Sequence, residues 1–227
     1  MRPGARVALY YAPQADDPLW HLAADWLGRD PATGAPRPQP ELPDIADVTA
    51  DPRTYGFHAT LKPPMRLVEG AAWTDVLDAA AEVAAGIPAF DLPGLSVQNL
   101  DGFLALRETT PSPELQALAD ACVIGLDALR APPGEAELAR RRRNGLRPAQ
   151  EAMLARWGYP YVFATWFFHM TLTRRLTPAE HAVYRPEAEA FFATALTRPR
   201  RVDDISLFVQ DQTGAPFTLA ERIPLRG

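Results

Sequence analysis

The sequence predicts an α+β protein built as two pseudo-symmetric lobes, each an antiparallel sheet with helices on the outside. Short apolar and aromatic runs alternate with stretches whose apolar residues recur every three to four positions, as strands and helices require. The order of elements then repeats, because a strand with His58 and a strand with His169 are each followed by a helix and a hairpin. Ser96 follows His58 by 38 residues and Ser206 follows His169 by 37, which indicates a duplication. We therefore expect residues 1–227 to form one bilobal domain, with the His-x-Thr strands facing a central cleft.

The first half of the chain is expected to open with a strand and a capped helix. Residues 7–11 form an apolar and aromatic run typical of a strand. Residues 18–27 carry apolar side chains at helical spacing, with Asp17 placed to cap the helix and Gly28 to end it. The remaining expected elements are, in order, a His58 strand ending at Pro63, a helix over 71–85, strands over 90–100 and 103–107, and a helix over 114–129.

The second half follows an insertion at about residues 132–156, which contains four consecutive arginines at 140–143. Thr177 and Glu180 form a capping-box pattern that predicts the start of a long helix. The expected elements from the insertion onward are, in order, a helix over 148–157, strands over 161–163 and 166–173, a helix over 177–196, and strands over 205–210 and 217–223.

The composition is that of an ordinary globular protein. Of 227 residues, 47% are hydrophobic and 22% are charged, with a net charge of −5. An acidic chain is a poor match for a general nucleic-acid binder, although the arginines leave a local basic site open. Cys122 is the only cysteine, which excludes an internal disulfide and a cysteine metal cluster and fits a reducing compartment. No apolar segment approaches the roughly 20 residues of a membrane helix and no signal peptide is visible, so we expect a cytoplasmic protein without a membrane partner.

Two matching tetrads form the candidate site. Both have the pattern aromatic-His-x-Thr, followed by leucine, and they hold two of the four histidines of the chain. Residues two apart on a strand point to the same face, so His58 lies beside Thr60 and His169 lies beside Thr171. If the two strands meet, two imidazoles and two hydroxyls share one site.

A single His-x-Thr pattern usually indicates a packing histidine, but two copies at matching positions favour a function. Core packing does not need His and Thr at both positions, since apolar residues would leave no polar group to satisfy. A zinc site would need a third ligand, and neither tetrad has one nearby on its strand face. A serine-type triad would need a nucleophile turn of the Gly-x-Ser-x-Gly kind, which is absent. General acid–base catalysis at phosphorus remains.

Two imidazoles suit an in-line displacement at a phosphodiester. A neutral histidine can accept a proton from water while a protonated one delivers a proton to the leaving oxygen. Thr60 and Thr171 would donate hydrogen bonds to the non-bridging oxygens as negative charge builds there. This chemistry needs neither a metal nor a cofactor, and we expect none.

The paired tetrads in a duplicated α+β chain resemble the two-histidine (2H) phosphoesterase superfamily. The longer segments 55–64, 157–162 and 168–173 look like a bacterial branch encoded with phosphonate-degradation (carbon–phosphorus lyase) genes. The resemblance spans nearly the whole chain. It implies a metal-free reaction in a central cleft, with His58, Thr60, His169 and Thr171 as the catalytic residues. It also implies a substrate of the ribose 1,2-cyclic phosphate type, opened to a phosphate monoester.

Five further residues are candidates for substrate binding. Lys62, the only lysine, shares the strand face of the first tetrad and is expected to contact a substrate phosphate, with a surface lysine as the alternative. Tyr11 and Tyr55 are expected to line the cleft, although aromatic residues on strands usually pack in a core. Arg141 and Arg143 would hold a second, terminal phosphate if the insertion folds over the cleft, and would otherwise lie on a solvated helix face.

The predicted function is a metal-independent cyclic phosphodiesterase for a small phosphorylated sugar or nucleotide in phosphonate catabolism. One alternative keeps the chemistry but acts on RNA ends carrying a 2′,3′-cyclic phosphate, which the acidic net charge disfavours. Another is a binding protein of the same fold that senses a metabolite without turnover. The complete His/Thr quartet disfavours that reading, since a binder needs no pair of proton-transfer groups.

Overall fold

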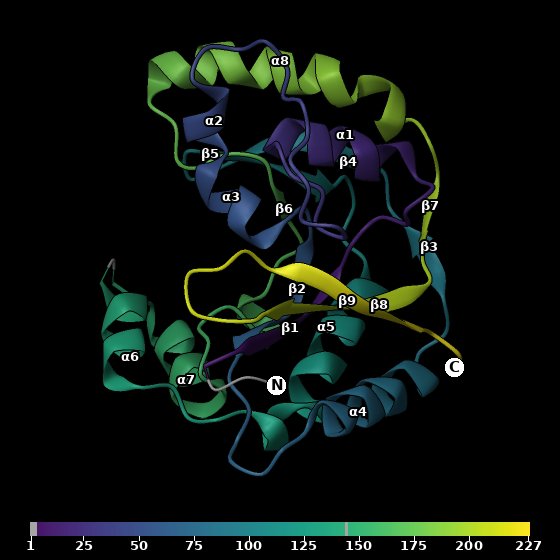
Figure 1. Ribbon diagram of the computed structural model, residues 1–227, viewed down its shortest axis with the longest axis vertical. Coiled ribbons are helices and arrows are strands. Elements are labelled where there is room, and N and C mark those ends of the chain that lie inside the picture. Colours follow the sequence, from purple (N-terminus) through teal and green to yellow (C-terminus); the bar gives the residue numbers. More distant parts are fainter. Residues whose placement is uncertain (1–3, 144) are drawn as a thin grey trace.

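The computed structural model describes residues 4–143 and 145–227 and confirms the α+β class (Figure 1). The strands are β1 (Arg6–Tyr11), β2 (Ala59–Met65), β3 (Phe90–Leu92), β4 (Leu95–Leu100), β5 (Phe103–Glu108), β6 (Met170–Thr171), β7 (Arg200–Val202), β8 (Asp204–Gln210) and β9 (Thr218–Pro224). The helices are α1 (Pro18–Leu27), α2 (Ile45–Val48), α3 (Ala50–Tyr55), α4 (Trp73–Ala85), α5 (Pro113–Gly125), α6 (Glu135–Arg142), α7 (Pro148–Trp157) and α8 (Pro178–Leu196). Short 3₁₀ turns are η1 (Asp127–Leu129) and η2 (Phe163–Thr165).

Helix ends lie where capping chemistry placed them. The Asp17 carboxylate accepts a hydrogen bond from the Leu19 amide at 2.8 Å, and Gly28 ends α1 with a left-handed φ of 78°. Thr177 and Glu180 form the predicted capping box at the start of α8. The local signals in the sequence therefore fixed these boundaries.

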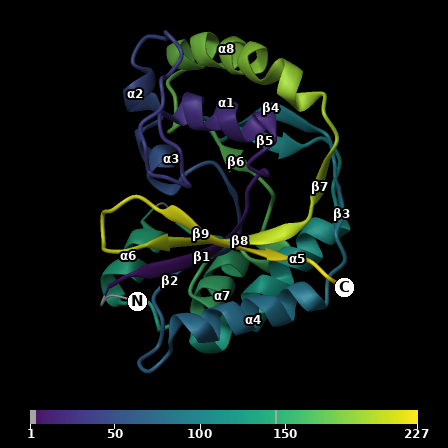
Figure 2. The same cartoon turned by 45° about the vertical axis from the view of Figure 1, so that its right-hand side comes forward.

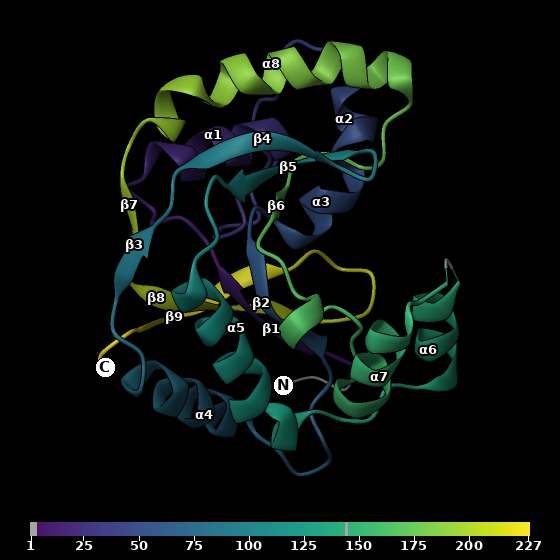
Figure 3. The ribbon, with the colours of Figure 1, turned by 180° about the vertical axis from the view of Figure 1, so that it is seen from behind.

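A seven-stranded sheet runs through the protein in the order β4-β5-β6-β2-β1-β8-β9, and its neighbouring strands pair antiparallel. A separate ribbon pairs β3 with β7. The helices cover the two ends of this sheet differently, because α4 and α5 pack on β2, β8 and β9, whereas α8 packs on β4 and on α1. Figure 3 shows these two groups of helices on opposite sides of the β2–β6 region. The two histidine strands thus meet between two helix-covered parts.

Each part of the sheet contains strands from both halves of the chain. The first-half hairpin β4–β5 pairs with β6, the strand of the second tetrad. The second-half hairpin β8–β9 joins β2, the strand of the first tetrad, through β1. This exchange links the halves, and the order of elements in the sequence does not reveal it.

The aromatic segment before His169 differs from the sequence prediction. The predicted strand over 161–163 is wrong, because the chain turns there into η2, which the Thr165 hydroxyl closes by donating to the Pro160 and Val162 carbonyls at 2.7 and 2.8 Å. Of the strand predicted over 166–173, only Met170–Thr171 pairs with neighbours. Tyr161, Trp166 and Phe167 of this segment line a cavity described below, so these aromatic side chains form a cavity wall and not a sheet.

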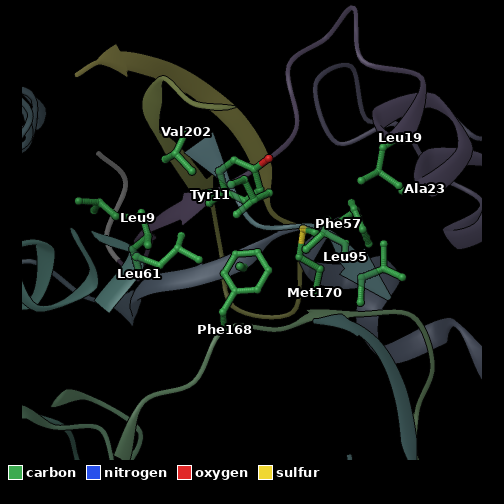
Figure 4. Close-up of a cluster of buried hydrophobic side chains, with 14 of the residues drawn as sticks. Leu9, Tyr11, Leu19, Ala23, Phe57, Leu61, Leu95, Phe168, Met170 and Val202 are labelled. Atoms are coloured by element: carbon green, nitrogen blue, oxygen red, sulfur yellow. The ribbon is translucent and has the colours of Figure 1, made fainter. Parts of the chain in front are cut away.

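Two apolar clusters lie on the two faces of the central strand β1. Leu9 and Tyr11 belong to the larger one, and Figure 4 shows the Tyr11 and Phe168 rings beside each other within it. Tyr10 belongs to the smaller one, with Phe208 and other residues. Within the described residues, no helix combines the length and apolarity that crossing a membrane requires.

The expected insertion forms α6 and α7, which Figure 2 shows apart from α1 and α8. Arg142 on α6 pairs with Glu151 on α7, with Nε 3.0 Å from the carboxylate, and this ion pair links the two helices. Arg141, one residue earlier, places its guanidinium 4.5 Å from the centre of the Tyr159 ring. The helix therefore turns neighbouring arginines toward different surroundings.

Candidate active site

His58 is held by its own backbone just before β2. Its Nδ1 lies 2.9 Å from the Gly56 carbonyl oxygen, and its Nε2 lies 3.2 Å from the Thr60 hydroxyl. A carbonyl oxygen can only accept, so Nδ1 carries the proton of the neutral ring and Nε2 is the free base. Gly56 has a φ of 79°, a left-handed conformation that favours glycine, and a side chain there would meet Pro31. The turn before His58 therefore sets its tautomer.

His169 repeats this arrangement before β6. Its Nδ1 lies 3.1 Å from the carbonyl oxygen of Phe167, again two residues earlier in the chain. The neutral ring again has Nε2 as its free base. The two tetrads thus agree in side-chain spacing and in the hydrogen bond that orients each imidazole.

The pairing of β2 with β6 brings the quartet together. Ala59 is the partner of Met170 in this antiparallel pair. One residue further on each side, the same register sets Thr60 opposite His169 and His58 opposite Thr171, on one face of the sheet. All four side chains line a cavity of about 220 Å³. The structure therefore brings together, in the wall of one cavity, the four residues that the sequence paired.

Two tryptophans fix the backbone of the tetrads. The Trp166 indole donates to the Thr60 carbonyl at 2.8 Å, and the Trp26 indole donates to the Leu172 carbonyl at 3.1 Å. The two carbonyls lie in or beside the tetrads, where β2 and β6 pair over a short length. Each indole supplies the donor that such a carbonyl needs. The backbone of the tetrads is thereby held by the two indole groups, which are not members of the quartet.

The surroundings of both imidazoles favour the neutral form. Burial lowers the pKa of His58 to about 4, opposed by the Gly56 carbonyl and reinforced by His169. Burial also lowers the pKa of His169 from 6.5, opposed by the Phe167 carbonyl and reinforced by Arg107. In the free protein at pH 7, both rings are therefore bases. An anion between them would favour protonation of one.

Tyr10 is a cavity residue that the sequence did not single out. Its ring stacks on His58, with centroids 3.6 Å apart at an angle of 22°, and it lines the cavity with the quartet. The prediction for its neighbour Tyr11 was wrong, because Tyr11 points to the opposite face of β1 and packs against Phe168 in the core. Arg6 could have identified Tyr10 from the sequence. Residues 6 and 10 lie on the same face of the strand, and a charged residue indicates that this face is not part of the core.

The prediction for Lys62 was also wrong, and a β-bulge is the reason. In the β1–β2 pair, Tyr10 lies opposite Thr60 but Leu9 lies opposite Lys62, so β2 carries an extra residue between them. The bulge moves Lys62 to the core face, where only 2% of it is exposed. Its amine donates to the Val123 carbonyl at 2.8 Å and lies 4.0 Å from an oxygen of Asp127.

The remaining substrate-binding predictions divide. Tyr55 and Arg141 line the cavity of the quartet, and Arg140 and Arg6 line it as well. Arg143 is exposed and lies outside the residues lining this cavity, which matches the alternative of a solvated position. The insertion therefore reaches the cavity with α6, through two of its four arginines.

A second, larger cavity of about 460 Å³ adjoins the first. The two share Thr60, Tyr159 and His169 in their walls. Aromatic side chains make up much of the remaining wall, with Phe103, Tyr161, Trp166 and Phe167 contributing. Asp101, Arg147, Gln150 and Arg175 complete this wall. The quartet thus lies where two cavities meet, and the second cavity is the richer in aromatic side chains.

Metal-binding groups are sparse around the site. Over residues 4–143 and 145–227, no three side chains of His, Cys, Asp or Glu gather in an arrangement able to hold a metal ion. The metal-free reaction expected from the sequence stays a prediction, which a chelator can test.

The chain matches one family model and two curated relatives over most of its length. Residues 60–218 match the family described as "Protein of unknown function (DUF1045)". Two curated relatives are both named "Ribose 1,5-bisphosphate phosphokinase PhnN". The one from Janthinobacterium sp. (strain Marseille) is 43% identical over 98% of this chain and 51% of its own. The one from Laribacter hongkongensis (strain HLHK9) is 36% identical over 96% and 51%. The chain spans about half the length of these relatives.

Two solved structures have a similar course of the chain. One is titled "Crystal structure of phosphoesterase", with a TM-score of 0.46, 14% identity and 99% of both chains covered. Another is E. coli LigT complexed with 3'-AMP, with a TM-score of 0.43, 16% identity, and 98% of this chain and 99% of that chain covered. A likeness at this level does not establish an activity.

Proposed function

The chain belongs to the DUF1045 family, and we propose that it is a metal-independent cyclic phosphodiesterase that works with two histidines. Its substrate is a small phosphorylated sugar of the ribose 1,2-cyclic phosphate type, or a nucleotide cyclic phosphate. One observation carries the proposal: both imidazoles and both threonine hydroxyls line a single cavity. The Nδ1 of each imidazole is already engaged by a backbone carbonyl.

The reaction that fits this geometry is an in-line displacement. One imidazole takes a proton from water at Nε2 as the water oxygen attacks phosphorus. The bond from phosphorus to one ring oxygen of the cyclic ester breaks on the opposite side. That oxygen takes a proton from Nε2 of the other, protonated imidazole, and the product is a phosphate monoester. Thr60 and Thr171 donate to the non-bridging oxygens, which carry more charge in the transition state.

The names of the relatives support the sugar phosphate as substrate. They refer to ribose 1,5-bisphosphate, a ribose that carries two phosphates. A P-loop kinase motif ends in Gly-Lys followed by Ser or Thr, and the only lysine here, Lys62, follows Leu61. The sequence of this chain therefore lacks this kinase signature, and a phosphodiesterase joined to a kinase of phosphorylated ribose would act on related metabolites. We place the reaction in phosphonate catabolism on the sequence resemblance.

An assay with chelator-treated protein tests the proposal. The substrates are ribose 1,2-cyclic phosphate, a 2′,3′-cyclic nucleotide and a chromogenic diester. His58→Ala and His169→Ala should each lower kcat by about 10²- to 10⁴-fold, as expected for the loss of a general acid or base. His21→Ala is the matched control, since His21 is exposed on α1, and it should retain full activity.

The same assay separates the competing functions. Full activity in either cavity variant would refute the paired-histidine mechanism, and inhibition by the chelator would refute the metal-free reaction. Turnover restricted to RNA ends would identify the RNA-processing alternative. Tight binding of a cyclic phosphate without turnover would identify a sensor.

A further inference from the structure

The cavity of the quartet is more cationic than a cyclic phosphate requires. Among the described residues that line it are Arg6, Arg140 and Arg141, and no carboxylate lies with them in the wall. This concentration stands out in a chain whose net charge is −5. Glu137 lies 3.9 Å from Arg140 and 3.5 Å from Arg141 and balances one of these charges. A cyclic phosphodiester carries a single negative charge, so the three guanidinium groups still exceed what Glu137 and the scissile group balance together.

Two buried donors in the cavity wall have no protein acceptor. One is the hydroxyl of Tyr10, whose residue is completely buried, and the other is Nε of Arg141. Buried polar groups in folded proteins normally have a partner, and a donor without one is unfavourable. Both residues line the same cavity. An acceptor bound in this cavity would satisfy both donors.

The surroundings of Tyr10 indicate the charge of that acceptor. Burial raises the pKa of the Tyr10 hydroxyl well above its ordinary value, so this hydroxyl remains a donor. The groups that act on it next are Tyr55, Tyr159, Arg6 and Arg141, all from the same cavity wall. A pocket of hydroxyl donors and guanidinium groups suits an anion with several acceptor oxygens.

We propose that Tyr10, Arg6 and Arg141 form a subsite for a second phosphate of the substrate, beside His58. The proposal rests on the proposed function and narrows its substrate to a cyclic phosphodiester that also carries a phosphate monoester. Arg6 is oriented by Gln210, which accepts from its Nε at 2.7 Å. Arg141 is oriented by Glu137 at 3.5 Å and by the face of the Tyr159 ring. Both guanidinium groups are thus preformed for the phosphate.

The neighbouring cavity does not compete for this role. Its wall also contains two arginines, Arg147 and Arg175, but the Asp101 carboxylate lies in the same wall and Arg175 donates to the Asp101 carbonyl. Aromatic side chains make up much of the rest of this wall. The second phosphate therefore lies on the His58 side of the quartet, and the organic part of the substrate extends toward His169 and its aromatic neighbours.

The test compares two cyclic substrates, ribose 1,2-cyclic phosphate with and without a phosphate on its 5-hydroxyl. Tyr10→Phe keeps the ring that stacks on His58 and removes only the hydroxyl, and Arg141→Gln removes the charge. Each should raise KM for the 5-phosphorylated substrate by about 10- to 100-fold, as the loss of a hydrogen bond to a charged group predicts. Each variant should lower kcat/KM for the 5-phosphorylated substrate at least about tenfold more than kcat/KM for ribose 1,2-cyclic phosphate without the 5-phosphate.

Arg142→Gln is the matched control, because Arg142 is the next residue and pairs with Glu151 outside the cavity. It should leave both substrates unaffected. Equal impairment of both substrates by Tyr10→Phe and Arg141→Gln, or impairment of neither, would overturn the subsite. Far-UV circular dichroism and thermal melting confirm that each variant is folded.

Calorimetric titration with ribose 5-phosphate tests the subsite without requiring turnover. The unaltered protein and Arg142→Gln should bind it at least about tenfold more tightly than Tyr10→Phe and Arg141→Gln. If no cyclic substrate is turned over but this difference holds, the proposed function fails and the subsite stands. If turnover occurs and all four proteins bind ribose 5-phosphate equally, the subsite fails and the proposed function stands.

Discussion

The His58 and His169 sides of the site are alike in their reacting groups and differ in their surroundings. Each imidazole gives its Nδ1 to the carbonyl two residues earlier. Around them the chain diverges, because His58 lies under the Tyr10 ring in an arginine-lined cavity. His169 stacks on Phe167, with centroids 4.7 Å apart, beside the aromatic cavity. A duplicated unit can thus supply matched chemistry while its surroundings distinguish the two ends of a substrate.

The largest expected effect tests whether the two histidines act as a unit. The double variant His58→Ala/His169→Ala should lose about as much kcat as the more damaged single variant, within the range of about 10² to 10⁴, because an acid without its base completes no cycle. Steady-state kinetics of the two single variants and the double variant measures this. Multiplicative losses would mean that the two sides contribute independently.

The threonines should show the next largest effect. Thr60→Val and Thr171→Val keep the side-chain shape and remove the hydroxyl, so each should lower kcat by about 10- to 10³-fold, as the loss of an oxyanion donor does. KM should change much less, since these hydrogen bonds strengthen in the transition state. A loss confined to one threonine would show that the matched geometry does not produce matched roles.

The pH profile tests the electrostatic difference. The pKa of His58 is lowered to about 4 and that of His169 is lowered from 6.5, so a free protein with one neutral and one protonated imidazole exists chiefly in the acid range. We expect kcat/KM to peak below pH 6.5 and to fall about tenfold per pH unit on the alkaline side. The measurement is kcat/KM from pH 4 to 9, with the fold checked at each pH. A maximum above pH 7.5 would contradict this reading.

The two tryptophan anchors should differ more in activity than in stability. Trp166→Phe and Trp26→Phe each remove an indole donor and should each cost about 1 kcal/mol or more of unfolding free energy. Of the two, Trp166 donates to the carbonyl of Thr60, a proposed catalytic residue, at 2.8 Å, and it also lines the larger cavity. A several-fold fall in kcat in Trp166→Phe alone, with chemical denaturation as the stability measure, would separate positioning from general stability.

Sequence periodicity predicted the quartet and the capped helices, and it failed where a strand departs from regularity. Alternation put His58 and Thr60 on one face correctly, but the same rule extended to Lys62 crosses a bulge that no local signal announces. For Tyr10 and Tyr11, alternation along β1 separates the two side chains without saying which one faces the site, and the charge of Arg6 is what distinguishes the Tyr10 face.

Lys62 and Thr173 occupy equivalent places after the two tetrads and give the smallest expected effect on activity. The Lys62 amine donates to the Val123 carbonyl near the end of α5, and the Thr173 hydroxyl accepts from the Leu104 amide at 2.9 Å. Both side chains point into the core. We therefore expect that the two residues connect their strands to different neighbours and make no contact with the substrate.

Lys62→Met and Thr173→Val test that assignment. Each should retain kcat and KM within about twofold, since neither side chain lines the cavity. Thr173→Val leaves the buried Leu104 amide without its acceptor and should cost about 1–3 kcal/mol of stability. Lys62→Met should lower the free energy of unfolding by less, because it also removes a buried amine. Burial lowers the pKa of this amine to about 8, which shows that its charged form is unfavourable there. A rise in KM in Lys62→Met but not in Thr173→Val would contradict this assignment. It would mean that Lys62 contacts the substrate and that β2 distinguishes the two ends of the substrate.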